Sequence, residues 1–292
     1  MYDKIINWTQ ISSSKYNINF KNSNFPNRSN TINNLNKQFD LDGLHPQSQM
    51  ITLRGSKSVI KIVTHQFKHC LYSLLNDNNL MNQDNLLIST HNPYDNSHIT
   101  QTSILDEINS GSVYRTAYKK YIIPGSLDIL CPIIFFIDKT HTDTNGRWCL
   151  EQIRFTLGIF NRQTRNQPRA WRTLGYIADQ QQIIAENPLQ KGIDYHHMIE
   201  IILSDFKQCQ QHKFKWELAN NNNNQTKTVY FVIPVMFIVG DTDGHDKLAG
   251  RYTSRTKVAR LCRYCDCPFD ATDNPDFKFQ YTTHKNMFIW VV

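Results

Sequence analysis

The stretch PIIFFIDKTH (residues 132–141) is an apolar run that stops at an aspartate, Asp138. Continuous apolar runs of this length, without polar alternation, are typical of strands buried on both faces of a sheet. A second run of the same kind, VYFVIPVMFIVGD (residues 229–241), ends at Asp241. We therefore predict two buried strands, each with an aspartate at its carboxyl end.

Between these two runs the sequence predicts a hairpin and one long helix. Residues 151–160 (EQIRFTLGIF) and 170–178 (AWRTLGYIA) have strand composition and are joined by a polar loop. An apolar stripe at helical spacing follows, with Asp194 as the candidate N-cap. The stripe consists of Tyr195, Met198, Ile199, Ile202, Phe206 and Cys209. The order strand, hairpin, helix, strand predicts an α/β fold with a ribonuclease H-like mixed sheet, in which the two aspartate-ending strands are parallel neighbours.

The remaining segments differ in composition from this core, which we bound at residues 119–245. Residues 1–50 are rich in Asn and Ser and are predicted to be disordered. Residues 51–118 are predicted to be helical, with Thr64 capping one helix and Gly111 ending another. Residues 246–292 form a basic, cysteine-containing insertion.

Asp138 and Asp241 are the candidate catalytic and metal-binding residues. Carboxylates at neighbouring strand ends can hold Mg²⁺ or Mn²⁺ together with substrate phosphates, and two such ions can promote phosphodiester cleavage. The alternative is that each aspartate only forms a turn or caps a helix. Asp143 competes for the first role, and Asp243 and Asp246 compete for the second.

The charge balance favours a polyanionic partner, with DNA first and an anionic membrane surface second. The formal net charge is +7, and two long stretches contain arginine or lysine but no acid. They suit contacts to a phosphate backbone, although a solvated basic loop is the alternative reading. The candidate DNA contacts are Arg154, Arg162, Arg165, Arg169, Arg172, Arg251, Arg255, Lys257, Arg260 and Arg263. No apolar run reaches the roughly 20 residues that span a bilayer, so we expect a soluble intracellular protein with no membrane partner.

The cysteines near the C-terminal end favour a structural zinc site. The sequence CRYCDCP places Cys262 and Cys265 at the C-x-x-C spacing with which two thiolates hold one zinc ion. Cys267 can compete with Cys265, and His284 or His245 could complete the ligand set. Free thiols are the alternative.

With these motifs in view, the chain resembles the Plavaka-type and KDZ-type transposases, which are CACTA-like DDE elements. The resemblance rests on PIIFFIDKTH, on FTLGIF followed by RTLGY, and on GDTDGHDKLAG followed by CRYC, and it covers roughly residues 59–292. It implies a ribonuclease H-like core, two divalent metal ions, and DNA strand cleavage and transfer in the nucleus. Asp138 matches the first acid of the family triad and Asp241 the second, and the cysteines match the start of a zinc-binding insertion.

The sequence departs from the family at the third acid, which should lie on a later helix. No acidic residue after the cysteines falls on helix-like sequence, so we expect a truncated, incomplete catalytic domain. Three hypotheses follow: a transposase fragment, a defective or domesticated nucleic-acid-binding protein, and a compact metal-dependent nuclease with a local third acid. A homo-oligomer is compatible with each of them.

Overall fold

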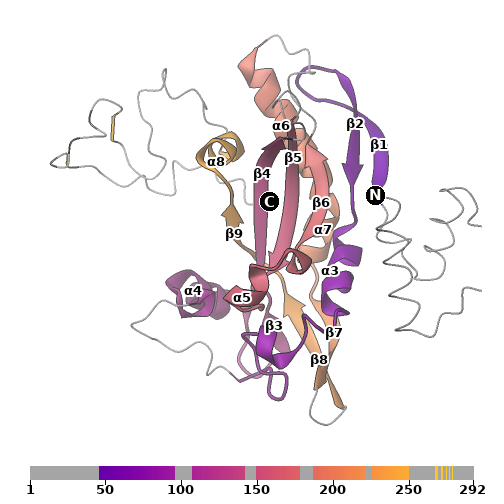
Figure 1. Cartoon of the computed structure of the whole chain (residues 1–292), viewed down its shortest axis with the longest axis vertical. Helices are drawn as coiled ribbons and strands as arrows, with labels where there is room; N and C mark the ends of the chain where they lie inside the picture. The colour runs from indigo at the N-terminus through magenta and orange to yellow at the C-terminus, as the bar shows by residue number, and fades with distance from the viewer. Residues whose placement is uncertain are drawn as a thin grey trace, which may run out of the picture. The chain divides into compact units, whose positions relative to one another are not determined.

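The computed structural model describes residues 46–95, 107–141, 149–177, 187–220 and 225–249, with a few single positions between 267 and 278. These residues form an α/β architecture with two mixed β-sheets (Figure 1). The segment predicted to be disordered, up to residue 45, lies outside the described residues, as does most of the cysteine-containing insertion.

The larger sheet has six strands in the order β1-β2-β6-β5-β4-β9. Its strands are β1 (Gln47–Thr52), β2 (Val59–Thr64), β4 (Ile133–His141), β5 (Cys149–Leu157), β6 (Arg172–Ile177) and β9 (Val235–Val239). Strands β4, β5 and β6 are antiparallel neighbours, whereas β9 runs parallel to β4. The predicted hairpin and the predicted parallel pairing of the two aspartate-ending runs are therefore both present.

The smaller sheet has three strands in the order β3-β8-β7. Its strands are β3 (Asp128–Leu130), β7 (Phe214–Asn220) and β8 (Gln225–Val232). Strands β3 and β8 are parallel and continue into β4 and β9 after Pro132 and Pro234, respectively. The pairing persists across this point, because Cys131 N–H donates to the Val232 carbonyl and Ile133 N–H donates to the Pro234 carbonyl, both at 2.8 Å.

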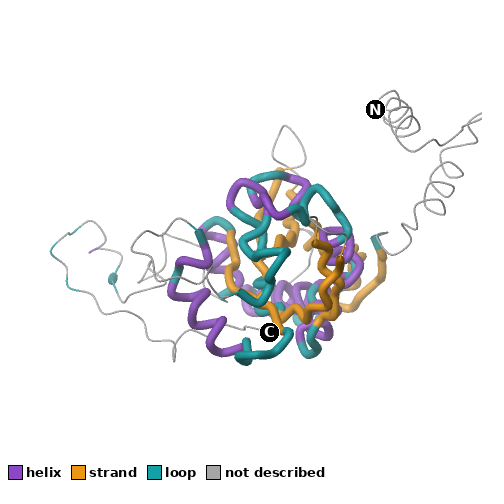
Figure 2. Tube along the Cα trace, turned by 90° about the horizontal axis from the view of Figure 1, so that it is seen from below, coloured by secondary structure: helices purple, strands orange, loops and turns teal. Residues whose placement is uncertain are grey.

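Six α-helices and three short 3₁₀ helices are described. The α-helices are α3 (Phe67–Leu75), α4 (Ser112–Tyr121), α5 (Arg162–Arg165), α6 (Pro188–Ile202), α7 (Ser204–Gln210) and α8 (Thr242–Leu248). The 3₁₀ helices are η2 (Gln83–Asn85), η4 (Ile108–Ser110) and η5 (Pro168–Ala170). Figure 2 shows the helices lying around the strands. No helix within the described ranges is both long enough and apolar enough to cross a membrane.

The main core lies between one face of the large sheet and helices α3, α6 and α7. The ring of Phe67 on α3 lies 4.8 Å, centre to centre, from both Phe155 on β5 and Phe206 on α7. Phe206 also meets Phe135 on β4 edge-to-face at 5.2 Å. Such pairs add about 0.5–1.5 kcal/mol each to the burial of their area. These aromatic contacts hold the helices against the centre of the sheet.

Helix α6 can approach the sheet closely because β6 carries Gly175 beneath it. A Cβ atom at Gly175 would lie 2.9 Å from Ile202 on α6 and 2.9 Å from the Val63 carbonyl oxygen on β2. Real Cβ atoms essentially never make contacts this short. The glycine therefore sets the distance between the helix layer and the sheet.

Three local predictions are corrected by the structure. Residues 47–52 and 59–64 form strands β1 and β2, so the first is not disordered and the second is not helical. Helix α3 begins after Gln66 instead of Thr64, because the β-branched run VIKIVT extends as a strand. Gly111 does end a short helix as predicted, because it is the C-cap of the 3₁₀ helix η4, and it is also the N-cap of α4.

The long predicted helix also differs in its ends. It begins at Pro188 after an Asn187 N-cap, whose side chain accepts from Gln190 N–H, and it breaks at Leu203 into α6 and α7. Asp194 is not its cap. The Asp194 carboxylate is fully buried and accepts hydrogen bonds from the backbone N–H groups of Gly55 and Ser56, so it holds the β1–β2 turn against α6.

The apolar run at residues 229–241 is two strands and not one. Pro234 has no N–H to donate to a ladder, and at this point the chain passes from β8 in the small sheet to β9 in the large sheet. Strand β7, which precedes the asparagine run, was not predicted. The β7–β8 hairpin is thus an addition between the helices and β9.

Candidate functional site

The carboxyl ends of β4 and β9 meet at one edge of the large sheet. The register pairs Phe135 with Ile238 and Phe136 with Val239. Asp138 and Asp241 each come two residues after the last of these pairs. If the same register is extended, the backbone of Asp138 lies opposite the backbone of Asp241. A Cβ atom at Gly240 would lie 2.5 Å from the Ile137 carbonyl oxygen, which shows that the chain remains against β4 up to this point.

Asp138 is half-buried near the end of β4. Side chains alternate along a strand, so Asp138 shares the sheet face of Phe136, opposite the face that packs on the helices. Its Oδ1 atom accepts a hydrogen bond from the N–H of Lys139 at 2.8 Å. On this face Phe136 meets Trp171 edge-to-face, with 6.2 Å between ring centres. The hydrogen bond from Lys139 uses one of the two carboxylate oxygens of Asp138, and the side chain lies at a partly open position.

Asp241 is exposed and is the N-cap of α8. Its Oδ1 atom accepts a hydrogen bond from Gly244 N–H at 2.6 Å, as expected for a capping aspartate. Helix capping and metal binding are compatible in part for Asp241, because capping uses one carboxylate oxygen and leaves the negative charge in place. The carboxylate also complements the positive end of the backbone dipoles of α8.

A third carboxylate, Glu151 on β5, lies in this region and was not predicted. Glu151 is buried, it accepts a hydrogen bond from the Tyr195 hydroxyl, and its Oε2 atom lies 3.7 Å from Lys247 Nζ. Burial and the nearby negative charges of Glu151 and Asp241 raise the pKa of Tyr195 above its ordinary value. The phenol is therefore neutral and acts as a hydrogen-bond donor at physiological pH.

The acids occupy two sides of the sheet edge. Glu151 pairs across the ladder with Lys139, and Asp138 pairs with Gln152, so Glu151 and Asp138 project to opposite faces. Among the residues that the structure describes, no group of three or more His, Cys, Asp or Glu side chains is placed to hold a metal ion. Asp246 is on α8, the side chain of Asp243 is not among those described, and Asp143 lies outside the described residues.

Asp138 and Asp241 supply the ligand type that a divalent ion of the Mg²⁺ type prefers. Such an ion is usually held by one or two carboxylates, together with waters and substrate phosphates, instead of a complete protein cage. Asp138 and Asp241 are accessible carboxylates that follow the last paired residues of adjacent parallel strands. They would hold the ion through oxygen atoms, which is the ligand type that it prefers.

The zinc prediction falls almost entirely outside the described residues. Cys262, Cys265 and His284 are not described. Cys267 is half-buried, and its thiol donates to the Pro268 carbonyl at 3.6 Å. His245, the other candidate, lies on α8 beside Gly240.

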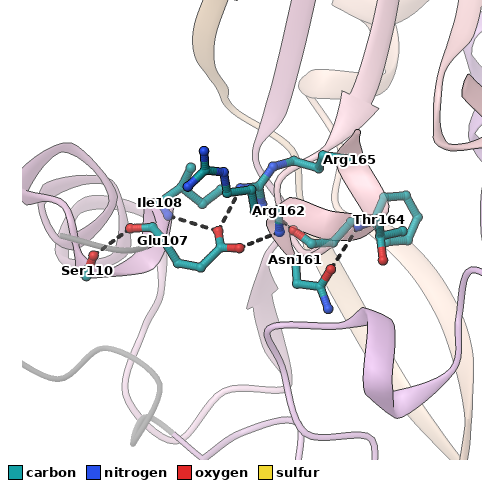
Figure 3. A network of polar contacts seen from close by, with 8 residues as sticks. Glu107, Ile108, Ser110, Asn161, Arg162, Thr164 and Arg165 are labelled. Atoms are coloured by element: carbon teal, nitrogen blue, oxygen red, sulfur yellow. Dashed lines mark hydrogen bonds and ion pairs between the residues drawn. The ribbon is translucent and has the colours of Figure 1, made fainter. Parts of the chain in front are cut away.

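The arginines of the β5–β6 connection divide into packed and exposed side chains. Arg165 is almost buried, forms an ion pair with Glu107 at 2.6 Å, and donates to the Phe160 carbonyl (Figure 3). Glu107 also accepts from the N–H groups of Ile108 and Arg162. These contacts tie the segment before α4 to the start of α5, so Arg165 has a structural role that its sequence context did not indicate.

Two further arginines are engaged with the protein itself. The Arg172 guanidinium donates to the Ser73 hydroxyl and carbonyl on α3, and burial lowers its pKa. Arg154 lies 5.9 Å from the centre of the Trp171 ring, within cation–π range. Arg162 and Arg169 have exposed side chains. The other candidate DNA contacts are Arg251, Arg255, Lys257, Arg260 and Arg263, which lie outside the described residues.

Comparison with known proteins gives no match: no protein-family model, no curated protein and no solved structure is similar to this chain.

Proposed function

We propose that this chain contains a ribonuclease H-like core derived from a DDE-type DNA transposase. The observation that carries the proposal is the strand order β6-β5-β4-β9, in which three antiparallel strands are followed, after helices α6 and α7, by a strand parallel to the first. Asp138 and Asp241 follow the last residue pairs of the two parallel strands. The β7–β8 hairpin is an addition to this order.

In this proposal Asp138 and Asp241 bind Mg²⁺ or Mn²⁺, and DNA is the substrate. When bound, such ions would supply Lewis-acid stabilisation for phosphodiester cleavage. The contribution of the chain itself is to fix the two carboxylates at one sheet edge through the β4–β9 ladder. The neutral Tyr195 and the Glu151–Lys247 pair support the same edge from the helix-covered side. The proposal also includes a zinc ion at Cys262 and Cys265, a nuclear location, and a possible homo-oligomer.

A second candidate function is nucleic-acid binding without cleavage. The observation that favours it is the Gly244 N–H to Asp241 hydrogen bond, which gives Asp241 a structural use independent of any metal. Within the described part of the chain, the two aspartates also do not belong to a group of three or more potential metal ligands. A defective or domesticated copy would retain salt-sensitive DNA binding and would not nick DNA.

The test is Mn²⁺ binding by the full chain, measured by calorimetry, with the variants Asp138→Asn and Asp241→Asn. Asparagine caps helices as well as aspartate does, so Asp241→Asn preserves α8 while it removes the charge. Glu217→Gln is the matched control, because it removes one exposed carboxylate from β7. We expect both aspartate variants to lose the same binding event and the control to retain it.

Nicking of supercoiled plasmid in Mn²⁺ then separates the two candidate functions. Metal binding that depends on both aspartates, together with nicking, supports the nuclease reading. Metal binding without nicking supports the non-cleaving reading. Mn²⁺ binding that is unchanged in both variants would exclude the acidic site altogether.

A further inference from the structure

Helix α4 and the loop that follows it present a surface on which basic and aromatic residues are mixed. The exposed residues are Lys119, Lys120, Tyr121, Ile123 and Leu127, and we name this set the α4 surface. The sequence from residue 111 to residue 127 contains three basic residues and no acidic one. Positive charge therefore occurs here together with one exposed aromatic ring and two exposed apolar side chains.

A small cavity opens beside the α4 surface. It has a volume of about 230 Å³ and is lined by residues of three segments, including Tyr94, Tyr118, Ile122 and Pro124. Cavities for drug-sized ligands have volumes of roughly 300–1,000 Å³, so this one suits a single flat ring system. Its lining includes the rings of Tyr94 and Tyr118, beside which a planar group could stack.

The charges of the α4 surface favour an anionic ligand. Asp128 also lines the cavity, but its carboxylate is 3% exposed and forms an ion pair with Lys213 Nζ at 2.6 Å. Its negative charge is therefore compensated within the protein. Lys119 and Lys120 lie at the end of α4, where no acidic side chain is near in sequence. The charged side chains of the α4 surface are therefore both basic.

The aromatic rings are held in position. Lys120 Nζ lies 4.9 Å from the centre of the Tyr121 ring, which keeps a cation beside an exposed aromatic face. The hydroxyl of Tyr94 donates to the Thr228 carbonyl at 2.6 Å, so this ring is fixed against β8. A ring that is already ordered loses little conformational entropy when a planar group stacks on it.

We propose that the α4 surface binds single-stranded nucleic acid, with a base stacked on the aromatic residues and phosphates paired with Lys119 and Lys120. Proteins bind single strands through this combination of aromatic stacking and a basic track, without reading sequence. A duplex cannot present its base faces in this way. The inference rests on the proposed function as a DNA-processing core.

The position of α4 agrees with that function. Its buried Tyr114 packs in a small core with Ile122 and Leu130, and Met236 of β9 contacts the same cluster. Helix α4 thus lies beside β9 (Figure 1), the strand that leads to Asp241. A strand bound on the α4 surface would run along the edge of the large sheet toward the proposed acidic site.

The test measures binding of a fluorescent 15-nucleotide oligothymidylate to the full chain in EDTA, by anisotropy, over a range of salt concentrations. The variant Lys119→Glu/Lys120→Glu should lower affinity more than about tenfold and reduce the salt slope by roughly 1.4, because each phosphate contact contributes about 0.7. Tyr121→Ala should lower affinity about tenfold, and Tyr121→Phe should restore it.

The matched control is Lys61→Glu/Lys207→Glu, which changes the net charge equally on β2 and α7, away from α4. Equal losses in the α4 variant and the control would overturn the proposal, as would a wild-type chain that does not bind the oligonucleotide. Binding to phosphatidylserine vesicles alone would also overturn it and would identify a membrane-facing patch. The assay is run in EDTA and so does not depend on a divalent ion at the acidic site. Loss of Mn²⁺ binding at that site and loss of oligonucleotide binding at the α4 surface are therefore separate outcomes.

Discussion

Tyr195 on α6 donates its hydroxyl hydrogen to the buried Glu151 carboxylate on β5, and Lys247 on α8 approaches the other oxygen of the same carboxylate at 3.7 Å. Three elements that are distant in sequence are therefore joined at one charged group. The group lies on the helix-covered side of the sheet edge at which β4 and β9 end.

The Tyr195–Glu151 pair should contribute to stability as a unit. Glu151→Ala leaves a buried hydroxyl without its acceptor and should lower the free energy of unfolding by about 1–3 kcal/mol. Tyr195→Phe should cost a similar amount, and the double variant should cost less than the sum, with a coupling of at least about 0.5 kcal/mol. Urea denaturation of the four proteins measures this cycle. Strict additivity would show that the two side chains do not interact.

Gly175 should be intolerant of any side chain. Gly175→Ala places a Cβ atom against Ile202 and the Val63 carbonyl, and overpacking of this kind costs about 1–3 kcal/mol. Gly192 on α6 is the control, since a Cβ atom there would meet nothing within 4 Å. Gly192→Ala should stabilise the protein by about 0.5–1 kcal/mol, because alanine is the better helix former. Thermal unfolding of both variants checks the opposite signs.

The Glu107–Arg165 ion pair should contribute more than an exposed pair. Its side chains are 18% and 12% exposed, whereas those of Glu200 and Arg54 are 50% and 59% exposed. Removing Glu107 as Glu107→Ala leaves a largely buried guanidinium uncompensated, and we expect a loss of about 2–4 kcal/mol. Arg54→Ala should change stability by less than about 1 kcal/mol. Similar effects of the two changes would show that Arg165 is solvated.

Stability should decline at alkaline pH. Burial raises the pKa of the Cys70 thiol to about 11, and burial also raises the pKa values of Cys131, Tyr114 and Tyr195. In the unfolded chain thiols ionise near pH 9 and phenols near pH 10, so above these values the unfolded state releases protons that the folded state retains. The free energy of unfolding should be unaffected by these groups below about pH 9. It should then fall by up to about 1.4 kcal/mol per pH unit for each group.

Denaturant titrations at pH 8, 9, 10 and 11 measure this decline. In Cys70→Ala the slope between pH 9 and 11 should be shallower, because one of the titrating groups is gone. A slope identical to that of the wild type would contradict the assignment to Cys70.

The central sheet could be predicted from the sequence because its strands are strongly apolar and local. The run before Asp138 and the hairpin at β5–β6 are each recognisable without any knowledge of their neighbours. Strand β2 was missed although VIKIVT is rich in β-branched residues, because Val63 also fits a helical spacing with Phe67. The division of residues 229–241 into two strands at Pro234 could not be predicted in the same way. It depends on the sheet that each half joins, and the apolar run does not contain that information.

Only those site residues that directly follow an apolar run could be predicted from the sequence. Asp138 and Asp241 follow apolar runs and could be paired by topology. Glu151 could not be found in this way, since Tyr195 is 44 residues away and Lys247 lies on a different element again. The packing of Arg165 and Arg172 was equally invisible, because their partners Glu107 and Ser73 come from segments before β4.

The paired passage of two strands past Pro132 and Pro234 has a mechanical consequence. Two parallel strands bend at the same level, and the hydrogen bonds of Cys131 and Ile133 join them on both sides of the bend. A single strand with one proline could rotate at that point by itself, whereas these two hydrogen-bonded strands must move together. A displacement of β3 and β8 in the small sheet would therefore move β4 and β9 of the large sheet together.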